Sequence, residues 1–509
     1  TNVAALSTTQ LSALTATQTA SLTNTQLNAL TSTKLGSFTE SQIEALTTTQ
    51  VASISTANLV SLGATQIAAL ATTQVSNLSA TQIGALTTTN VGSLTETQVG
   101  AFTATQIKSL STTNLSALDG TQAAALTTTQ VANLTTTQVG ALNATDIGEL
   151  DATQIGALSA TLLAKLTTEA VVALDATQLA GLNTTQLQSF VTTQMAALDT
   201  TDIAEFTETQ VATLSATQIR SLTATAVGAL AETQIAALTT AQVQSLSTTS
   251  LADLDGTQVA ALTTTQVRSI SNIQIAALST TDIQEFTTDQ IAALTVTQLG
   301  AFTSTKYAAL TDAQIAAMTL TQVQAISASN LSALDLTQIA ALTTTHVGGL
   351  STTQLAGLST TNLRALDETQ FGQLSTTQVK ALSATQIAGL QATDISEMAN
   401  TQLEALTTTQ VAALTSTNVA MLADTQVAAF TATQLGRLTN AVVHAFDATQ
   451  LATLSSTQVQ AFTTSQIAAL DETDLDEFTT AQVAALSTAQ VRALATTVIA
   501  GISSNAIAA

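Results

Sequence analysis

The sequence predicts an all-α solenoid of short capped helices, with one helix in each eight-residue repeat. Three observations lead to this prediction: a period of eight residues along the whole chain, a helix-start signal in each repeat, and a composition dominated by Ala, Thr, Leu, Gln, Val and Ile. Self-similarity at a short fixed period is the signature of a repeat architecture, in which each unit packs on its neighbours.

Bulky apolar residues mark the period. Leu6, Leu14, Leu22 and Leu30 are eight residues apart, and the phase continues to Ile502. We call each repeat an octad and number its slots by residue number modulo eight. Slot 6 carries Leu, Phe, Ile or Met; slot 7 Thr, Ser, Asp or Asn; slots 0 and 1 mostly Thr; slot 2 Gln; slot 3 Val, Ile or Leu; and slots 4 and 5 Ala, Gly or Ser. Since 509/8 is about 63, we predict a single continuous array of about 63 octads over residues 1–509.

The helix-start signal is visible in the octad at 406–413. Thr407 is a preferred N-cap type, and Gln410 stands three residues later, where its side chain can reach back to the cap. Leu406 and Val411 then occupy the two positions of a hydrophobic staple. Each octad is therefore expected to form a helix of one to two turns, which ends before the next cap.

Two other architectures compete with this one. A single continuous helix fails because one octad advances about 80° past two full turns, so the Leu row would wind around the helix. A β-solenoid is the serious alternative, since Thr, Val and Ile favour strands. Against it, slots 3 and 6 are separated alternately by three and five residues, which would place them on opposite faces of a strand.

Rare residues suggest a coil of two octads. Six basic residues share slot 4, and the gaps between them are all multiples of 16: Lys108, Arg220, Arg268, Arg364, Lys380 and Arg492. We therefore predict that one coil of the solenoid contains two octads. Lys108 and Lys380 are 34 octads apart, a difference of 272 in residue number, and so are Arg220 and Arg492. This recurrence indicates an internal duplication of a block of 34 octads.

Composition excludes several classes of function. A net charge of −23 argues against binding to nucleic acid and to anionic lipid surfaces. No apolar stretch is long enough to span a membrane. The chain has no Cys, and its two His residues are far apart and in different slots. We expect no catalytic residues, no metal site, no cofactor and no enzyme activity, and take both His residues as surface positions.

An acidic pattern is the strongest candidate for an interaction. Asp-x-x-Glu occurs at slots 2 and 5 in five octads: Asp146 and Glu149, Asp202 and Glu205, Asp282 and Glu285, Asp394 and Glu397, and Asp474 and Glu477. Three interpretations remain open. Asp replaces Gln in the cap and Glu lies on a solvated edge; the pair contributes to a calcium site, although it supplies too few oxygens alone; or the last four pairs form an assembly edge that faces the six slot-4 cations of another chain.

Thr at slots 0 and 1 allows another hypothesis. Regular Thr rows on a rigid body are typical of ice-binding surfaces, although helix capping explains the same residues. Both ends of the chain follow the motif, with no polar capping repeat. End-to-end and lateral self-association is therefore the partner prediction.

The repeated Leu-(Thr/Ser)-x-Thr-Gln-(Val/Ile)-x-Ala motif resembles the low-complexity arrays of large secreted or cell-surface, adhesin-like proteins of Gram-negative bacteria. The resemblance covers essentially the whole chain. It implies an extracellular structural protein, either a filament or surface-layer subunit or an adhesin stalk. The alternative function is a module that binds ice, mineral or calcium.

Overall fold

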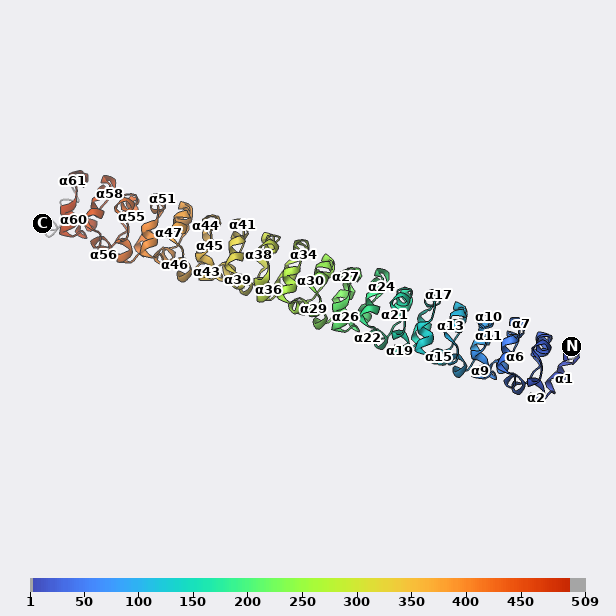
Figure 1. Cartoon of the computed structure of the whole chain (residues 1–509). Helices are drawn as coiled ribbons and strands as arrows, with labels where there is room; N and C mark the ends of the chain where they lie inside the picture. The colour runs from blue at the N-terminus through green and yellow to red at the C-terminus, as the bar shows by residue number, and fades with distance from the viewer. Residues whose placement is uncertain (1–2, 495–509) are drawn as a thin grey trace. The chain divides into compact units, whose positions relative to one another are not determined.

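In the computed structural model, which describes residues 3–494, every regular element is a helix. These residues form 61 α-helices and a 3₁₀-helix, η1 (Val3–Ala5), and they contain no strand (Figure 1). The all-α prediction of one short helix per octad is therefore confirmed, and the β-solenoid alternative is wrong for the described chain.

The helix bounds follow the octad with a single rule. Helix αn begins at residue 8n, from α1 (Thr8–Ser12) to α61 (Thr488–Ala493), and spans four, five or six residues. The four-residue helices, which end at slot 3, are α4, α7, α14, α17, α20, α37, α45, α51, α53, α54 and α55. The six-residue helices, which end at slot 5, are α6, α10, α13, α24, α26, α27, α29, α30, α32 to α36, α38 to α40, α44, α47, α48, α50, α60 and α61. All others have five residues and end at slot 4.

Helix starts have the predicted chemistry. At α51 (Thr408–Val411), the Thr407 N–H donates to Gln410 Oε1 at 2.7 Å, and the Gln410 N–H donates to Thr407 Oγ1 at 3.3 Å. The same reciprocal pair recurs along the array and satisfies N–H groups that have no partner within the helix. The cap at slot 7 is extended, and the described residues include no positive φ angle. The chain therefore turns between helices without needing glycine.

Each turn of the solenoid takes between three and four octads. Helices three positions apart pack together, as α44 (Thr352–Gly357) does with α41 (Ala328–Ser332) and α47 (Thr376–Ala381). Side-chain hydrogen bonds between layers join residues from 25 to 31 positions apart, most often 28 or 31. A turn is thus about three and a half octads. The predicted coil of two octads is wrong, and the multiples of 16 among the basic residues do not correspond to a turn.

The core consists of slots 3 and 6, as expected. In the octad at 406–413, Val411 is fully buried and Leu406 is almost so. The slot-3 residue sits on the inner face of its short helix, and the slot-6 residue lies in the link to the next cap. Because these two slots are buried in nearly every octad, each layer contributes a similar amount of apolar surface to the core.

The described chain divides into two compact units, residues 3–262 with α1 to α32 and residues 263–494 with α33 to α61. Within each unit the layers follow one another in chain order (Figure 1). The octad phase of the sequence continues from one unit to the next. None of the described helices has the length needed to cross a bilayer.

Candidate functional site

The buried Gln at slot 2 connects neighbouring layers. In α40 (Leu320–Ala325), Gln322 Oε1 accepts the Thr319 N–H at 2.7 Å, while its Nε2 donates to the Leu294 carbonyl at 2.7 Å and the Ile291 carbonyl at 2.9 Å. Those carbonyls lie at the end of a helix in the preceding layer. A helix this short leaves most of its carbonyls without an internal partner, and the Gln amide supplies one. We call this repeated arrangement the glutamine ladder.

Two unusual slot-2 residues also contact the preceding layer: His346 makes both contacts of the ladder, and Lys306 makes the contacts to the preceding layer alone. Lys306 Nζ donates to the Ala276 carbonyl at 2.7 Å and to the Ile275 carbonyl at 3.0 Å. His346 Nδ1 accepts the Thr343 N–H at 3.2 Å, and its Nε2 lies 2.7 Å from the Met318 carbonyl. This pairing requires the neutral ring, and burial lowers the pKa of His346. The expectation that His346 is a surface residue is therefore wrong, since it is 4% exposed.

The Asp residues of the Asp-x-x-Glu pattern take the place of the ladder Gln. Asp202 Oδ2 accepts the Asp199 N–H at 2.9 Å, as a Gln oxygen would, but an ionised carboxylate has no proton to donate to the preceding layer. Asp202, Asp394 and Asp474 are buried, Asp282 is half-buried, and their partner Glu residues are half-buried. The buried Asp residues therefore do not form the exposed assembly edge that the sequence suggested.

A third carboxylate accompanies each of these pairs, and sequence reasoning missed it. The N-cap that stands 27 positions before each patterned Asp is itself Asp in all five cases: Asp119, Asp175, Asp255, Asp367 and Asp447. Burial first, and then repulsion from the patterned Asp and this N-cap Asp, raises the pKa of Glu149 and of Glu205. Four of the five groups lie within one compact unit, namely those of Asp146, Asp202, Asp394 and Asp474. We call each of these four a carboxylate seam, because it brings together three acidic side chains from two layers.

The residue 30 positions before the patterned Asp differs from seam to seam. It is Ser116, Val172, Arg364 or His444, in chain order. Ser116 Oγ donates to Asp146, Arg364 Nε lies 4.0 Å from Asp394, and His444 Nδ1 lies 2.6 Å from Asp474. Two of the four seams therefore have a cationic or protonatable side chain at this position.

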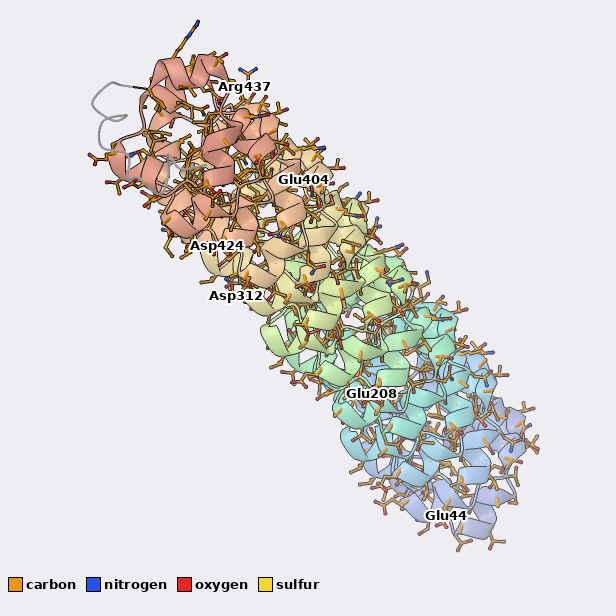
Figure 2. All side chains as sticks on the ribbon, turned by 90° about the vertical axis from the view of Figure 1, so that its left-hand side faces the viewer. Glu44, Glu208, Asp312, Glu404, Asp424 and Arg437 are labelled. Atoms are coloured by element: carbon orange, nitrogen blue, oxygen red, sulfur yellow. The ribbon has the colours of Figure 1, made fainter. Side chains whose placement is uncertain are left out.

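The six slot-4 cations are exposed, but the structure does not gather them at one site. Arg364 faces a seam of its own chain, whereas Lys108, Arg220, Arg268, Lys380 and Arg492 project from separate layers. Other charged residues are also exposed, among them Glu208, Asp312 and Arg437 (Figure 2).

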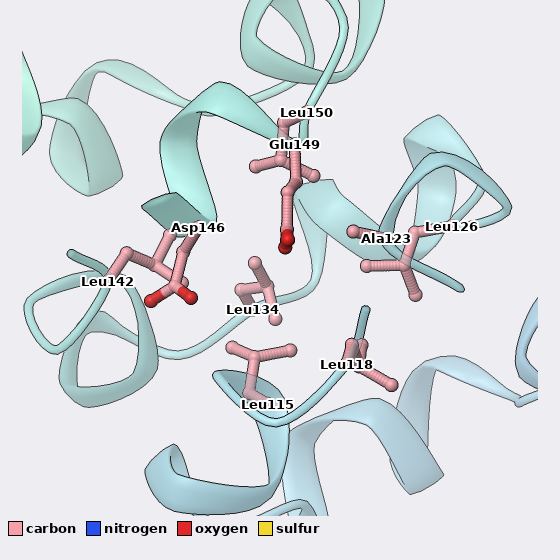
Figure 3. Close-up of a pocket in the computed structure, with 9 residues that line it drawn as sticks. All are labelled: Leu115, Leu118, Ala123, Leu126, Leu134, Leu142, Asp146, Glu149 and Leu150. Atoms are coloured by element: carbon pink, nitrogen blue, oxygen red, sulfur yellow. The ribbon is translucent and has the colours of Figure 1, made fainter. Parts of the chain in front are cut away.

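A small cavity adjoins the first seam. Slot 3 is Ala at position 123, where most octads carry Val, Ile or Leu, and the missing volume leaves about 20 Å³ (Figure 3). The lining is mostly leucine, including Leu115, Leu118 and Leu134, with the Asp146 and Glu149 carboxyl groups beside it. This space admits about one water molecule and is too small for an organic ligand.

Filling this cavity should stabilise the array. We expect Ala123→Val to raise the free energy of unfolding by about 1 kcal/mol, because the added methyl groups are buried in existing space. Ala124→Val is the matched control, since Ala124 is exposed on the same helix, α15 (Gly120–Ala124). Urea denaturation of both variants measures the difference, and equal effects would show that the cavity closes without the extra side chain.

Restoring the ladder at a seam should also stabilise the chain. We expect Asp202→Gln to add about 1 kcal/mol, because the new amide can donate to the Leu174 and Val171 carbonyls, the positions that the ladder uses in the preceding layer. Thr201→Ala, at an exposed neighbouring position, is the control. Urea denaturation and amide exchange in residues 168–206 report the effect. Destabilisation by Asp202→Gln would mean that the seam carboxylates hold the layers together better than the ladder does.

The fold and these side chains define a class, the tandem-repeat α-solenoid. Three segments match the model of the ALTTAQ repeat, residues 267–304, 347–384 and 467–504. Their starts are ten and fifteen octads apart, so all three matches have the same phase.

Other comparisons add little. No curated relative matches the chain. A solved structure with some similarity is the leucine-rich repeat-containing protein LegL7 from Legionella pneumophila, with 11% identity, coverage of 50% of this chain and 80% of that chain, and a TM-score of 0.14. At that score the likeness supports no statement about fold or function.

Proposed function

We propose that this chain is a structural protein of the cell exterior, a filament or surface-layer subunit or a stalk, and not an enzyme. The observation that carries the proposal is that the recurring polar side chains bond to the chain's own backbone. The Ser, Thr and Asp residues of slot 7 cap helices, and the Gln residues of slot 2 join layers, octad after octad. The polar side chains that recur in each octad thus stabilise the solenoid itself.

Self-association is the second part of the proposal. The Asp residues of the seams are buried, so lateral contacts would use exposed carboxylates such as Glu44, Glu208 and Glu404 (Figure 2) together with the slot-4 cations. A net charge of −23 makes neighbouring copies repel one another. Lateral contacts between copies therefore need those few cations to meet carboxylates in register, and raised salt should weaken them.

The Thr side chains of slots 0 and 1 carry the second candidate, an ice-binding surface. Slot 1 of one layer lies beside slot 0 of the preceding layer, as the hydrogen bond from Thr337 Oγ1 to Asp312 Oδ1 at 3.1 Å and that from Thr449 Oγ1 to Asp424 Oδ1 at 3.2 Å show. Absence of thermal hysteresis and ice shaping by the purified chain would remove this candidate.

The experiment that tests the proposal combines electron microscopy, circular dichroism and small-angle X-ray scattering on the purified chain at low and high salt. Fibres or bundles with a helical spectrum support a structural subunit, and isolated extended particles with a helical spectrum support a stalk. Lateral contacts through the cations predict that Lys108→Glu with Lys380→Glu prevents bundling, while the exposed control Thr433→Ala leaves it unchanged. Compact monomeric particles would contradict the proposal.

A further inference from the structure

His444 forms a close polar contact between two layers. It is the C-cap of α55 (Asn440–Val443), and its Nδ1 lies 2.6 Å from Oδ2 of Asp474 in α59 (Glu472–Asp476). Its other ring nitrogen, Nε2, lies 3.9 Å from Oδ2 of Asp471, the N-cap of α59. Both ring nitrogens therefore face carboxylates of the neighbouring layer.

The hydrogen bonds of Asp474 indicate where the proton lies. Its Oδ2 also accepts the Asp471 N–H at 2.8 Å, so the same oxygen faces two nitrogens. An ionised carboxylate oxygen can accept from both nitrogens at once, and a proton on His444 Nδ1 then completes the short contact. A second proton on Nε2 faces the Asp471 carboxylate, so the doubly protonated, cationic ring fits both neighbours.

We propose that His444 is a proton-dependent clamp between two layers, closed when its ring is cationic and weakened when the ring is neutral. The equivalent positions supply natural comparisons. Arg364 faces Asp394 with a charge that does not titrate, whereas Val172 at the Asp202 seam has no charge. One chain thus contains a permanent clamp, a titratable clamp and a seam without a cation at this position.

The other ionisable groups around His444 are acidic. Asp471, Asp474 and Glu477 face it from the neighbouring layer, the helix α59 also carries Glu472 and Asp476, and the next N-cap on the His444 side is Asp447. The helices that pack against α55, α52 (Ser416–Ala420) and α58 (Thr464–Ala468), carry no ionisable side chain.

The direction of the pH effect follows from these neighbours. The hydrogen bond to Asp474 and then its charge raise the pKa of His444 above the ordinary value of 6.5. A raised pKa means that the folded chain binds the proton more tightly than the unfolded chain. The clamp therefore contributes fully below pH 6.5 and is lost as the pH rises through the pKa of the folded chain.

A divalent metal ion is the competing occupant of this position. His444, Asp471 and Asp474 can each offer a ligand atom within 4.8 Å of the others. However, the two carboxylates face different ring nitrogens, and a single ion can bind only one of these. The geometry therefore favours a proton on each nitrogen over one shared metal ion.

Histidine NMR on the full chain tests the assignment directly, because the chain has two His residues, one in each kind of environment. We expect the Cε1–H resonance of His444 to titrate above pH 6.5 and that of the buried His346 to titrate below it, or not at all while the chain is folded. His444→Gln assigns the resonances. Asp474→Asn keeps an acceptor for the cap and should move the His444 titration back towards the ordinary value. A His444 titration at or below pH 6.5 in the unmodified chain would overturn the proposal.

Amide exchange tests whether protonation closes the layers. Amide exchange rates, corrected for intrinsic exchange, give the equilibrium constant for local opening of residues 440–478. This constant should increase about two- to fivefold as the pH rises from slightly acidic to slightly alkaline, a factor expected for a half-exposed ion pair. Residues 360–398, with Arg364, are the internal control and should change little. His444→Arg should remove the pH dependence and keep the protection. An equal response of both segments would contradict the clamp, and protection that requires added zinc chloride and is lost with chelator would replace the proton by a metal ion.

Discussion

A Gln322→Glu chain is expected to lose about 3–5 kcal/mol of stability in the layers around α40, the cost of placing an uncompensated charge in the interior. Glu keeps the oxygen that accepts the Thr319 N–H, but it puts a second oxygen where Nε2 donates to the Ile291 and Leu294 carbonyls. The substitution therefore replaces two attractive contacts with repulsive ones while changing the size of the side chain very little.

Two matched variants separate the causes of this loss. Gln322→Met removes the hydrogen bonds without adding a charge and should cost about 1–3 kcal/mol. Thr321→Ala, at an exposed position on the same helix, should cost little. Amide exchange in residues 288–326 and urea denaturation provide the measurements. If Gln322→Glu unfolds like Thr321→Ala, the ladder does not hold the layers together.

Local structure was predictable because its causes lie within one octad. Thr407, Gln410 and the Leu406 and Val411 pair are all within six positions, so cap and staple can be read directly from their spacing. The cap explains why each helix begins at slot 0. The same reasoning predicted which slots are buried, since only slots 3 and 6 are consistently large and apolar.

The number of residues in one turn of the solenoid was not predictable in this way. It depends on the angle between successive short helices, which is set by the two extended residues of each link and by packing between layers. Nothing in a single octad encodes the distance of 28 residues over which Gln322 finds the Leu294 carbonyl. The spacing of the basic residues, which suggested 16, concerns exposed side chains that do not determine how layers pack.

The carboxylate seams were also not fully predictable, because their members come from different layers. Asp202 and Glu205 are visible as a local pattern, but their third member, Asp175, is recognisable only once the turn length is known. A search for residues that recur at a fixed distance before each patterned Asp would have found it, because the distance is 27 in all five cases. For the same reason, the acidic residues were assigned to an outer edge, whereas the Asp residues of the seams are buried between layers.

Tyr307, the single tyrosine of the chain, is expected to ionise only near pH 12 while the array is folded. It occupies slot 3 of α38 (Ser304–Ala309), is 2% exposed, and donates its hydroxyl to the Leu299 carbonyl at 3.1 Å. Its ring packs at 5.5 Å from that of Phe302. Burial disfavours the charged phenolate and raises the pKa of Tyr307 from 10.0 to about 12.

This shift makes stability fall at alkaline pH. Because the folded chain retains the phenolic proton that the unfolded chain loses, its contribution is complete below pH 10 and decreases by about 2–3 kcal/mol as the pH rises to about 12. Phenolate absorbance in the near ultraviolet measures the ionisation without interference, since the chain has no Trp. Tyr307→Phe is the control: it should cost about 1 kcal/mol at neutral pH, because the Leu299 carbonyl keeps the Phe302 N–H but loses the hydroxyl donor, and should remove this part of the alkaline destabilisation. An absorbance midpoint near pH 10 in the folded chain would mean that the phenol is accessible to water and that this layer is looser than its neighbours.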